Sequence, residues 1–156
     1  MHRNGIVYGV AALVAAAIVV GSPLPAGAQS GSATRPAAID AMVALPATGE
    51  QIQLVGTATV DASVAALDGA HYRMSYTCDI AGNGRTATPG ADYQLVGHTS
   101  NAVVFDGPLP ATVSAMCSAD LTGSATPQRY DIAVEVTVLA DASVGSAAVR
   151  QVVATR

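Results

Sequence analysis

Two cysteines, Cys78 and Cys117, are the residues whose type and placement most directly indicate a chemical bond in this chain. Each alternates in phase with apolar neighbours, so both thiols are expected to point into one core. In an oxidising compartment two such thiols form a disulfide. Closing the loop between these cysteines stabilises the folded state by roughly 4 kcal/mol in the chain-entropy model, because it reduces the entropy of the unfolded chain. We therefore predict one disulfide that joins two central strands.

Two histidines outside the amino terminus, His71 and His98, are the candidate general bases. Serines and aspartates are abundant, but the chain has no G-x-S-x-G turn to present a nucleophile. We expect both histidines to lie at strand ends in solvent. The sequence therefore predicts no catalytic residues and a protein that is not an enzyme.

Metal-binding and cofactor-binding signatures are missing from the sequence. The histidines are far apart, and neither H-x-x-x-H nor H-E-x-x-H occurs. Several aspartates fall near expected strand ends without the spaced pattern of a calcium loop: Asp79, Asp92, Asp106, Asp120 and Asp131. We expect these carboxylates to be solvated, and we predict neither a metal nor a cofactor.

The aromatic residues exclude a common kind of sugar-binding surface. The chain has no tryptophan, and Tyr72, Tyr76 and Tyr130 are in phase with core residues. Tyr93 is the only tyrosine whose side chain the sequence assigns neither to the core nor to the solvent. One exposed ring is a poor platform for stacking a sugar.

The best candidate for a binding surface is the polar, glycine-containing segment 81–92, AGNGRTATPGAD. It follows the first cysteine strand, and loops on rigid β-scaffolds often make contacts. The alternative is a plain mobile connection. The candidate binding residues in this segment are Asn83, Arg85, Thr86, Thr88 and Asp92.

The elements that must position these residues are expected to be β-strands. Period-two alternation is clearest over 72–80, 111–121 and 129–138, and weaker strands are expected over 52–60, 93–96, 102–105 and 147–153. Turn residues separate them at 68–69, 81–84, 89–90, 97–101, 106–108 and 143–146. The segment 36–45 fits an edge strand or a short helix, and we favour the strand. No convincing helical period follows residue 28.

Short strands at this spacing are typical of an all-β antiparallel sandwich or barrel. A disulfide between two central strands resembles the immunoglobulin-type sandwich, although no tryptophan is present to pack against it. The resemblance concerns architecture and not a family. We predict an Ig-like sandwich of about seven to eight short strands.

The first 28 residues have the pattern of a secretory signal peptide. His2 and Arg3 precede an almost wholly apolar run over 6–20, and Ala-Gly-Ala at 26–28 suits cleavage. The run is shorter than the roughly 20 residues of a membrane-spanning helix, although an uncleaved membrane anchor is the alternative. We predict a single mature domain over 29–156, flexible over 29–36, that is secreted or extracytoplasmic and not stably inserted in a membrane.

Charge and composition limit the classes of partner that this chain is expected to bind. The formal net charge is −4, and loss of Arg3 would leave six arginines against eleven acidic residues. Such an acidic chain is not expected to bind nucleic acid. Lysine is absent, and residues with GC-rich codons dominate, which suggests a GC-rich bacterium of actinomycete type.

The function most consistent with these observations is a non-catalytic interaction module of the cell envelope or the extracellular space. Its partner is an unknown protein, a wall component or a small ligand. The alternatives are a secreted enzyme inhibitor that presents a loop such as 86–89, a small-ligand carrier and, less favoured, a hydrolase.

Overall fold

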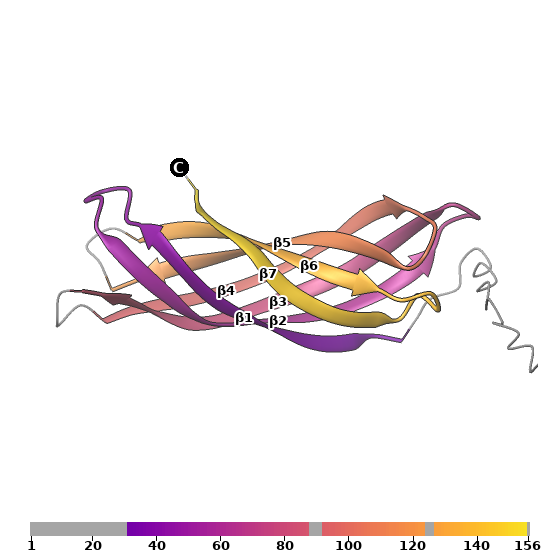
Figure 1. The fold of residues 1–156 in the computed structure, drawn as a ribbon, viewed down its shortest axis with the longest axis horizontal. Helices are drawn as coiled ribbons and strands as arrows, with labels where there is room; N and C mark the ends of the chain where they lie inside the picture. Colours follow the sequence, from indigo (N-terminus) through magenta and orange to yellow (C-terminus); the bar gives the residue numbers. More distant parts are fainter. Residues whose placement is uncertain (1–30, 88–91, 124–126, 156) are drawn as a thin grey trace, which may run out of the picture.

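Seven antiparallel β-strands form the fold in the computed structural model, which describes residues 31–87, 92–123 and 127–155 (Figure 1). The strands are β1 (Ala33–Ala44), β2 (Gln51–Ala66), β3 (His71–Thr86), β4 (Asp92–Asp106), β5 (Ala111–Thr122), β6 (Gln128–Val138) and β7 (Val144–Ala154). They form a single sheet in which every strand pairs with the next one along the chain. The fold is therefore a meander built from successive hairpins.

The sheet curls until its first and last strands run beside each other, which gives a nearly closed barrel (Figure 1). A side chain helps to join these strands. The guanidinium of Arg35 on β1 donates hydrogen bonds to the carbonyl oxygens of Val144 and Gly145 on β7, both at 2.8 Å. Arg35 therefore satisfies backbone acceptors where the two strands meet.

The all-β antiparallel prediction and the disulfide are confirmed, but the Ig-like sandwich is not. An Ig fold divides its strands between two sheets with Greek-key connections, whereas this chain forms one sheet in sequential order. The strands are also longer than expected, with 11 to 16 residues each. The predicted signal peptide, residues 1–28, lies wholly outside the described residues.

Two segments that we expected to be turns lie inside strands. Residues 81–84 continue β3, and residues 97–101 join the two predicted strands 93–96 and 102–105 into β4. Their glycines suggested turns, but the period-two alternation runs through both segments and the backbone stays extended. The segment 36–45 is a strand at the sheet edge, as favoured, and β1 begins three residues earlier than expected.

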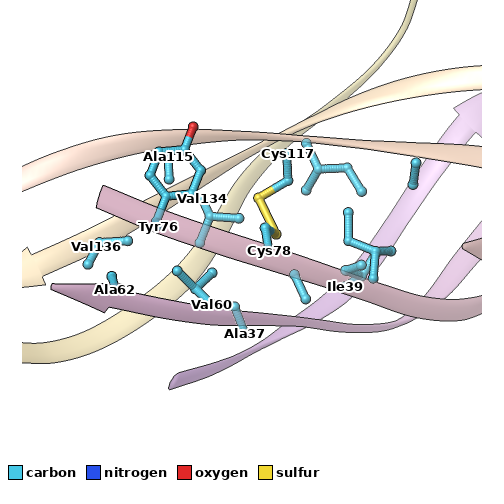
Figure 2. Close-up of a cluster of buried hydrophobic side chains, with 14 of the residues drawn as sticks. Ala37, Ile39, Val60, Ala62, Tyr76, Cys78, Ala115, Cys117, Val134 and Val136 are labelled. Atoms are coloured by element: carbon cyan, nitrogen blue, oxygen red, sulfur yellow. A yellow bond between two sulfur atoms is a disulfide. The ribbon is translucent and has the colours of Figure 1, made fainter. Parts of the chain in front are cut away.

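Strand alternation places an apolar core inside the barrel, as predicted for the three clearest strands. Figure 2 shows part of this core, in which Val60, Val134 and Val136 pack near the two cysteines. The core consists largely of small and β-branched side chains, which suit a curved sheet. The buried residues in the described chain are apolar by type.

Glycines allow the close backbone approaches in the sheet. Gly56 and Gly82 face each other across β2 and β3, and a Cβ at Gly56 would lie 2.4 Å from the carbonyl oxygen of Ala81. On β4, a Cβ at Gly97 would lie 2.1 Å from the carbonyl oxygen of Ser118. No side chain fits at these distances, so the curvature of the sheet depends on glycine at these positions.

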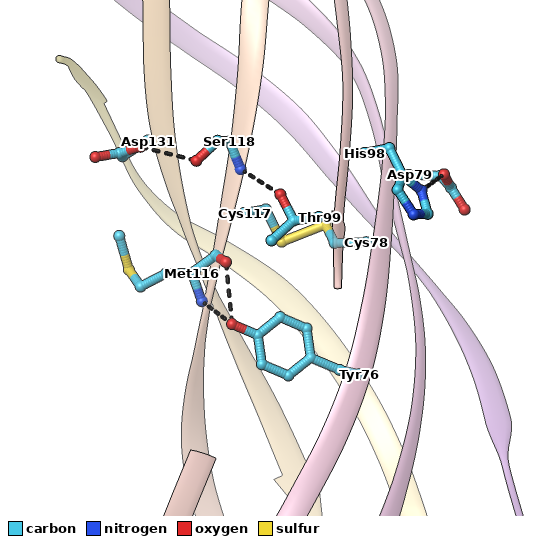
Figure 3. Close-up of a disulfide and its surroundings, with 9 residues drawn as sticks. All are labelled: Tyr76, Cys78, Asp79, His98, Thr99, Met116, Cys117, Ser118 and Asp131. Atoms are coloured by element: carbon cyan, nitrogen blue, oxygen red, sulfur yellow. Dashed lines mark hydrogen bonds and ion pairs between the residues drawn. A yellow bond between two sulfur atoms is a disulfide. The ribbon is translucent and has the colours of Figure 1, made fainter. Parts of the chain in front are cut away.

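The ladder between β4 and β5 is short. It comprises the pairs Gln94↔Thr122, Leu95↔Leu121 and Val96↔Asp120. Beyond this ladder, side chains connect β5 to β3 and β4 (Figure 3). The Tyr76 hydroxyl donates to the Met116 carbonyl oxygen and accepts from the Met116 N–H, both at 3.0 Å.

The Cys78–Cys117 disulfide lies beside Tyr76 and joins β3 to β5, with the two Cα atoms 6.0 Å apart (Figure 3). Both cysteines are fully buried, as their phase predicted. The bond crosses the region where the β4–β5 ladder has ended, so it replaces backbone pairing as the connection there.

Tyr130 on β6 contrasts with Tyr76. Its side chain is fully buried, and its hydroxyl has no hydrogen-bond partner in the described structure. Burial also raises the pKa of the Tyr130 phenol. The Tyr130 hydroxyl therefore carries a desolvation cost without a compensating bond.

Candidate functional site

The candidate site is an open depression on the outer face of the sheet, of about 520 Å³, which we call the outer trough. It crosses β2, β3 and β4. Its lining residues are Val55, Gly56, Ala81, Gly82, Asn83, Gln94 and Val96. A second depression of about 350 Å³ adjoins it and shares Asn83 and Gln94, and it is also lined by Gly84, Arg85 and Tyr93.

The strand register explains why these side chains meet. Asn83 on β3 is opposite Val55 on β2 and Gln94 on β4, so the three form one cross-strand row. The next row places Val96 opposite Ala81. Val55 and Val96 are 38% and 59% exposed, which is high for large apolar side chains. The trough thus combines apolar contact area with two neighbouring amides.

The chemistry of the trough is that of a neutral binding surface. Each amide of Asn83 and Gln94 both donates and accepts hydrogen bonds, and the valines offer apolar area. Arg85, exposed at the adjoining end, adds a cation. Tyr93 is only 8% exposed, so it provides no open face for stacking.

The predicted binding segment is therefore partly a strand surface and not a loop. Asn83, Arg85 and Thr86 belong to β3, and Asp92 begins β4 opposite Arg85. Asn83 and Arg85 meet in the second depression, whereas Thr86 is opposite Ile52, outside both linings. Thr88 and the proposed inhibitor residue Pro89 lie outside the described residues.

Sequence reasoning missed the contribution of the two flanking strands, above all Val55, Gln94 and Val96. A signal for Gln94 and Val96 is present, because they occupy the polar phase of the strand whose other phase carries Tyr93 and Leu95. Their position next to Asn83 depends on hairpin register. That register requires residues 81–84 to continue β3, whereas their glycine-rich composition indicates a turn.

His71 is held by carboxylates at the start of β3. Its Nδ1 lies 2.7 Å from Asp68 Oδ2, and its Nε2 lies 3.6 Å from Asp106 Oδ1. The hydrogen bond to Asp68 raises the pKa of His71 above its usual value. The pKa of Asp68 is lowered, chiefly by the N–H of Ala70 and then by His71.

His98 lies in the middle of β4, and not in the expected turn. Its Nδ1 is 2.6 Å from Asp79 Oδ1, on the neighbouring strand and on the outer side of the sheet (Figure 3). Ser118, a potential nucleophile on β5, instead donates its hydroxyl hydrogen bond to Asp131 at 3.0 Å. The imidazoles of His71 and His98 thus each contact a carboxylate in a solvent-exposed pair.

A further small depression, of about 230 Å³, is rich in hydroxyl groups. Its lining residues are Ser32, Asp61, Ser63, Ser75, Tyr76, Thr77, Ser100 and Asn101. The carboxylate of Asp61 accepts hydrogen bonds from the hydroxyls of Ser32 and Thr34. These contacts occupy the principal charged group of the depression.

Within the described ranges, no group of three or more His, Cys, Asp or Glu residues is placed to hold a metal ion. No helix in that part of the chain is long and apolar enough to cross a membrane. Comparisons of this chain with family models, curated proteins and solved structures find no match.

Proposed function

We propose that this protein is an exported, non-catalytic binding module that recognises its ligand through the outer trough. The observation that carries the proposal is the pairing of two amide side chains, Asn83 and Gln94, beside the exposed Val55 and Val96. Amides placed next to accessible apolar surface are suited to fixing the orientation of a ligand.

The shape of the trough favours an elongated ligand. It crosses three strands and continues into the depression beside Arg85. Suitable ligands carry alternating donors and acceptors along an apolar edge, as extended peptides and wall polymers do. Arg85 favours a ligand with an acidic or strongly polar group at that end.

Export is part of the proposal and rests on the leader pattern and the buried disulfide. Disulfides persist in oxidising compartments and are rare in the cytosol of most organisms. The runner-up functions have less support. The buried apolar side chains form one core cluster inside the barrel, part of which is drawn in Figure 2, and this gives less support to a carrier with an internal cavity. The inhibitor alternative depends on a loop that includes residues outside the described ranges.

Capture experiments with matched variants test the proposal. The mature protein is immobilised and exposed to wall polymers and culture-surface fractions, and the bound material is identified by mass spectrometry. The test variant is the double substitution Asn83→Ala and Gln94→Ala. The control is Thr112→Ala with Gln151→Ala, because both residues are exposed on strands away from the trough.

We expect the trough variant to lose at least about 5-fold in affinity for the captured ligand, since loss of two hydrogen bonds costs on the order of 1–3 kcal/mol. Arg85→Ala should weaken an acidic ligand by about 1 kcal/mol or more. Equal capture by the wild type and the trough variant would contradict the proposal. A hydrolytic activity that disappears in His71→Ala or His98→Ala would replace it with an enzyme.

A further inference from the structure

The last ten residues of β4, 97–106, form an edge of the sheet that we call the β4 edge. Its pairing with β3 continues to His71↔Asp106, whereas the described ladder with β5 ends at Val96↔Asp120. The backbone groups on the β5 side of this segment therefore have no ladder partner among the described residues.

Side chains occupy the β5 groups that a longer ladder would have used. The Ser118 N–H donates to Thr99 Oγ1 at 2.9 Å, and the Tyr76 hydroxyl binds both backbone groups of Met116. These β5 groups are thus satisfied without a backbone ladder to β4. The backbone groups of the β4 edge on the β5 side therefore stay without a ladder partner in the described structure.

The register identifies which β4 residues face the open side. Extending it would pair Ser118 with His98 and Met116 with Ser100. In the hydrogen-bonded pairs of an antiparallel ladder, which alternate with non-hydrogen-bonded pairs, the two residues exchange both backbone bonds. The backbone groups of Ser118 and Met116 point to this side, so their counterparts, the even-numbered residues of β4, direct their N–H and C=O groups outward. The Ala102 N–H agrees, since it donates to Asn101 Oδ1 at 2.8 Å rather than to β3.

The β4 edge lacks the usual protection against pairing. Natural edge strands carry lysine, proline or inward-pointing charges. Residues 99–105, TSNAVVF, contain no charged residue and no proline, and Val104 is 53% exposed. Such an edge is suited to accepting another strand.

We propose that the occupant is a second copy of this chain, paired antiparallel through the β4 edge with a two-fold axis at Ala102. This register places Ser100 opposite Val104 of the second copy. It also places His98 opposite Asp106 of the second copy, twice in the dimer, and these two residues are the ionisable groups of the 97–106 segment. Both side chains are well exposed.

Charge complementarity favours this occupant, and parity is compatible with it. His98 and Asp106 are equally distant from Ala102, so a two-fold pairing places each His98, which already contacts Asp79 on β3, opposite Asp106 of the second copy and keeps the two Asp106 carboxylates at opposite ends of the pairing. The same axis brings even-numbered residues opposite even-numbered ones, as hydrogen-bonded pairs require. A closed, isologous dimer results, in which Asn101 releases the Ala102 N–H to the second copy.

Cysteine cross-linking tests the register. Directly opposed residues in a hydrogen-bonded pair have Cα atoms about 5.5 Å apart, within the range of a disulfide. Ala102→Cys should therefore form a covalent dimer under mild oxidation, with Cys78–Cys117 intact by peptide mapping. Val104→Cys is the matched control, because the two copies of residue 104 would be separated by roughly 14 Å.

Sedimentation velocity tests the association itself across micromolar to millimolar protein. The wild type should show a concentration-dependent dimer. Ala102→Lys, which places like charges on the axis, should weaken the dimer by at least about 10-fold. Ala38→Lys, an exposed alanine on the outer face of β1, should leave the dimer unchanged.

Three outcomes would overturn the proposal. The first is a wild type that stays monomeric at millimolar concentration. This outcome counts against the proposal even if the monomer binds a foreign strand-forming peptide at β4. The second is a dimer that survives Ala102→Lys. The third is equal cross-linking of Ala102→Cys and Val104→Cys, which would indicate random collision.

Discussion

The same chemical change at two buried tyrosines should shift stability in opposite directions. Tyr76→Phe and Tyr130→Phe each remove one hydroxyl from the core. In Tyr76 that hydroxyl makes two hydrogen bonds to the backbone of Met116, whereas in Tyr130 it has no partner in the described structure. The pair of variants therefore isolates the hydrogen-bonding contribution from the apolar burial.

The magnitudes follow from these contacts. Tyr76→Phe removes two bonds and leaves an N–H and a carbonyl of Met116 without a protein partner. At about 1 kcal/mol for each bond, we expect a loss of roughly 2 kcal/mol, because the site is partly buried and water can replace some of the bonding. Tyr130→Phe removes an unsatisfied polar group and should add about 1 kcal/mol.

Urea denaturation followed by circular dichroism, with the disulfide intact, measures both changes. The denaturant slope m should stay constant, so that the midpoint shift reports the free energy of unfolding. Thermal midpoints should fall by roughly 8 °C for Tyr76→Phe and rise by roughly 4 °C for Tyr130→Phe. Destabilisation of similar size in both variants would refute the reasoning, because the Tyr130 hydroxyl would then have a partner.

Other features of the fold make separate predictions. Cys78→Ala should reduce the free energy of unfolding by about 2–5 kcal/mol, and an unchanged denaturation midpoint would contradict the structural role of the disulfide. Gly97→Ala should cost about 1–3 kcal/mol or more through backbone overlap, whereas Gly69→Ala, with open space around it, should be nearly neutral in the same assay. The raised pKa of His71 means that its pair with Asp68 stabilises the fold fully below about pH 6.5 and that this contribution is lost as pH rises through the folded pKa. The lowered pKa of Asp68 means that the contribution is present above about pH 4 and is lost as pH falls through the folded pKa of that carboxyl. The stability difference between wild type and His71→Ala should therefore be largest between these limits, and an NMR titration of His71 with a midpoint below 6.5 would contradict the assignment.

The sequence was sufficient for the local structure of the core. Alternation over 72–80, 111–121 and 129–138 predicted three strands and their buried faces, and the phase of Cys78 and Cys117 predicted the disulfide. These features depend on residues close in sequence, for which period-two burial is a direct signal.

The global arrangement depended on information that no short window contains. Gly82, Gly84 and Gly97 suggest turns, but here Gly82 and Gly97 permit close backbone approaches, and Gly84 leaves room for neighbouring side chains, within long, curved strands. Once those segments are extended, each strand pairs with its neighbour in the chain and the two-sheet expectation fails. The outer trough was only partly predicted for the same reason. Asn83 and Arg85 were identified, whereas Gln94 and Val55 become their neighbours only through hairpin register.

Amide hydrogen exchange of the mature protein, with and without its captured ligand, tests the central claim most directly. If the outer trough is the recognition surface, bound ligand should slow amide exchange at Val55, at residues 81–85 and at 94–96. Amide exchange in β6 and β7 should stay unchanged. Protection confined to β5–β7, or no change at Asn83 and Gln94 under saturating ligand, would contradict the account.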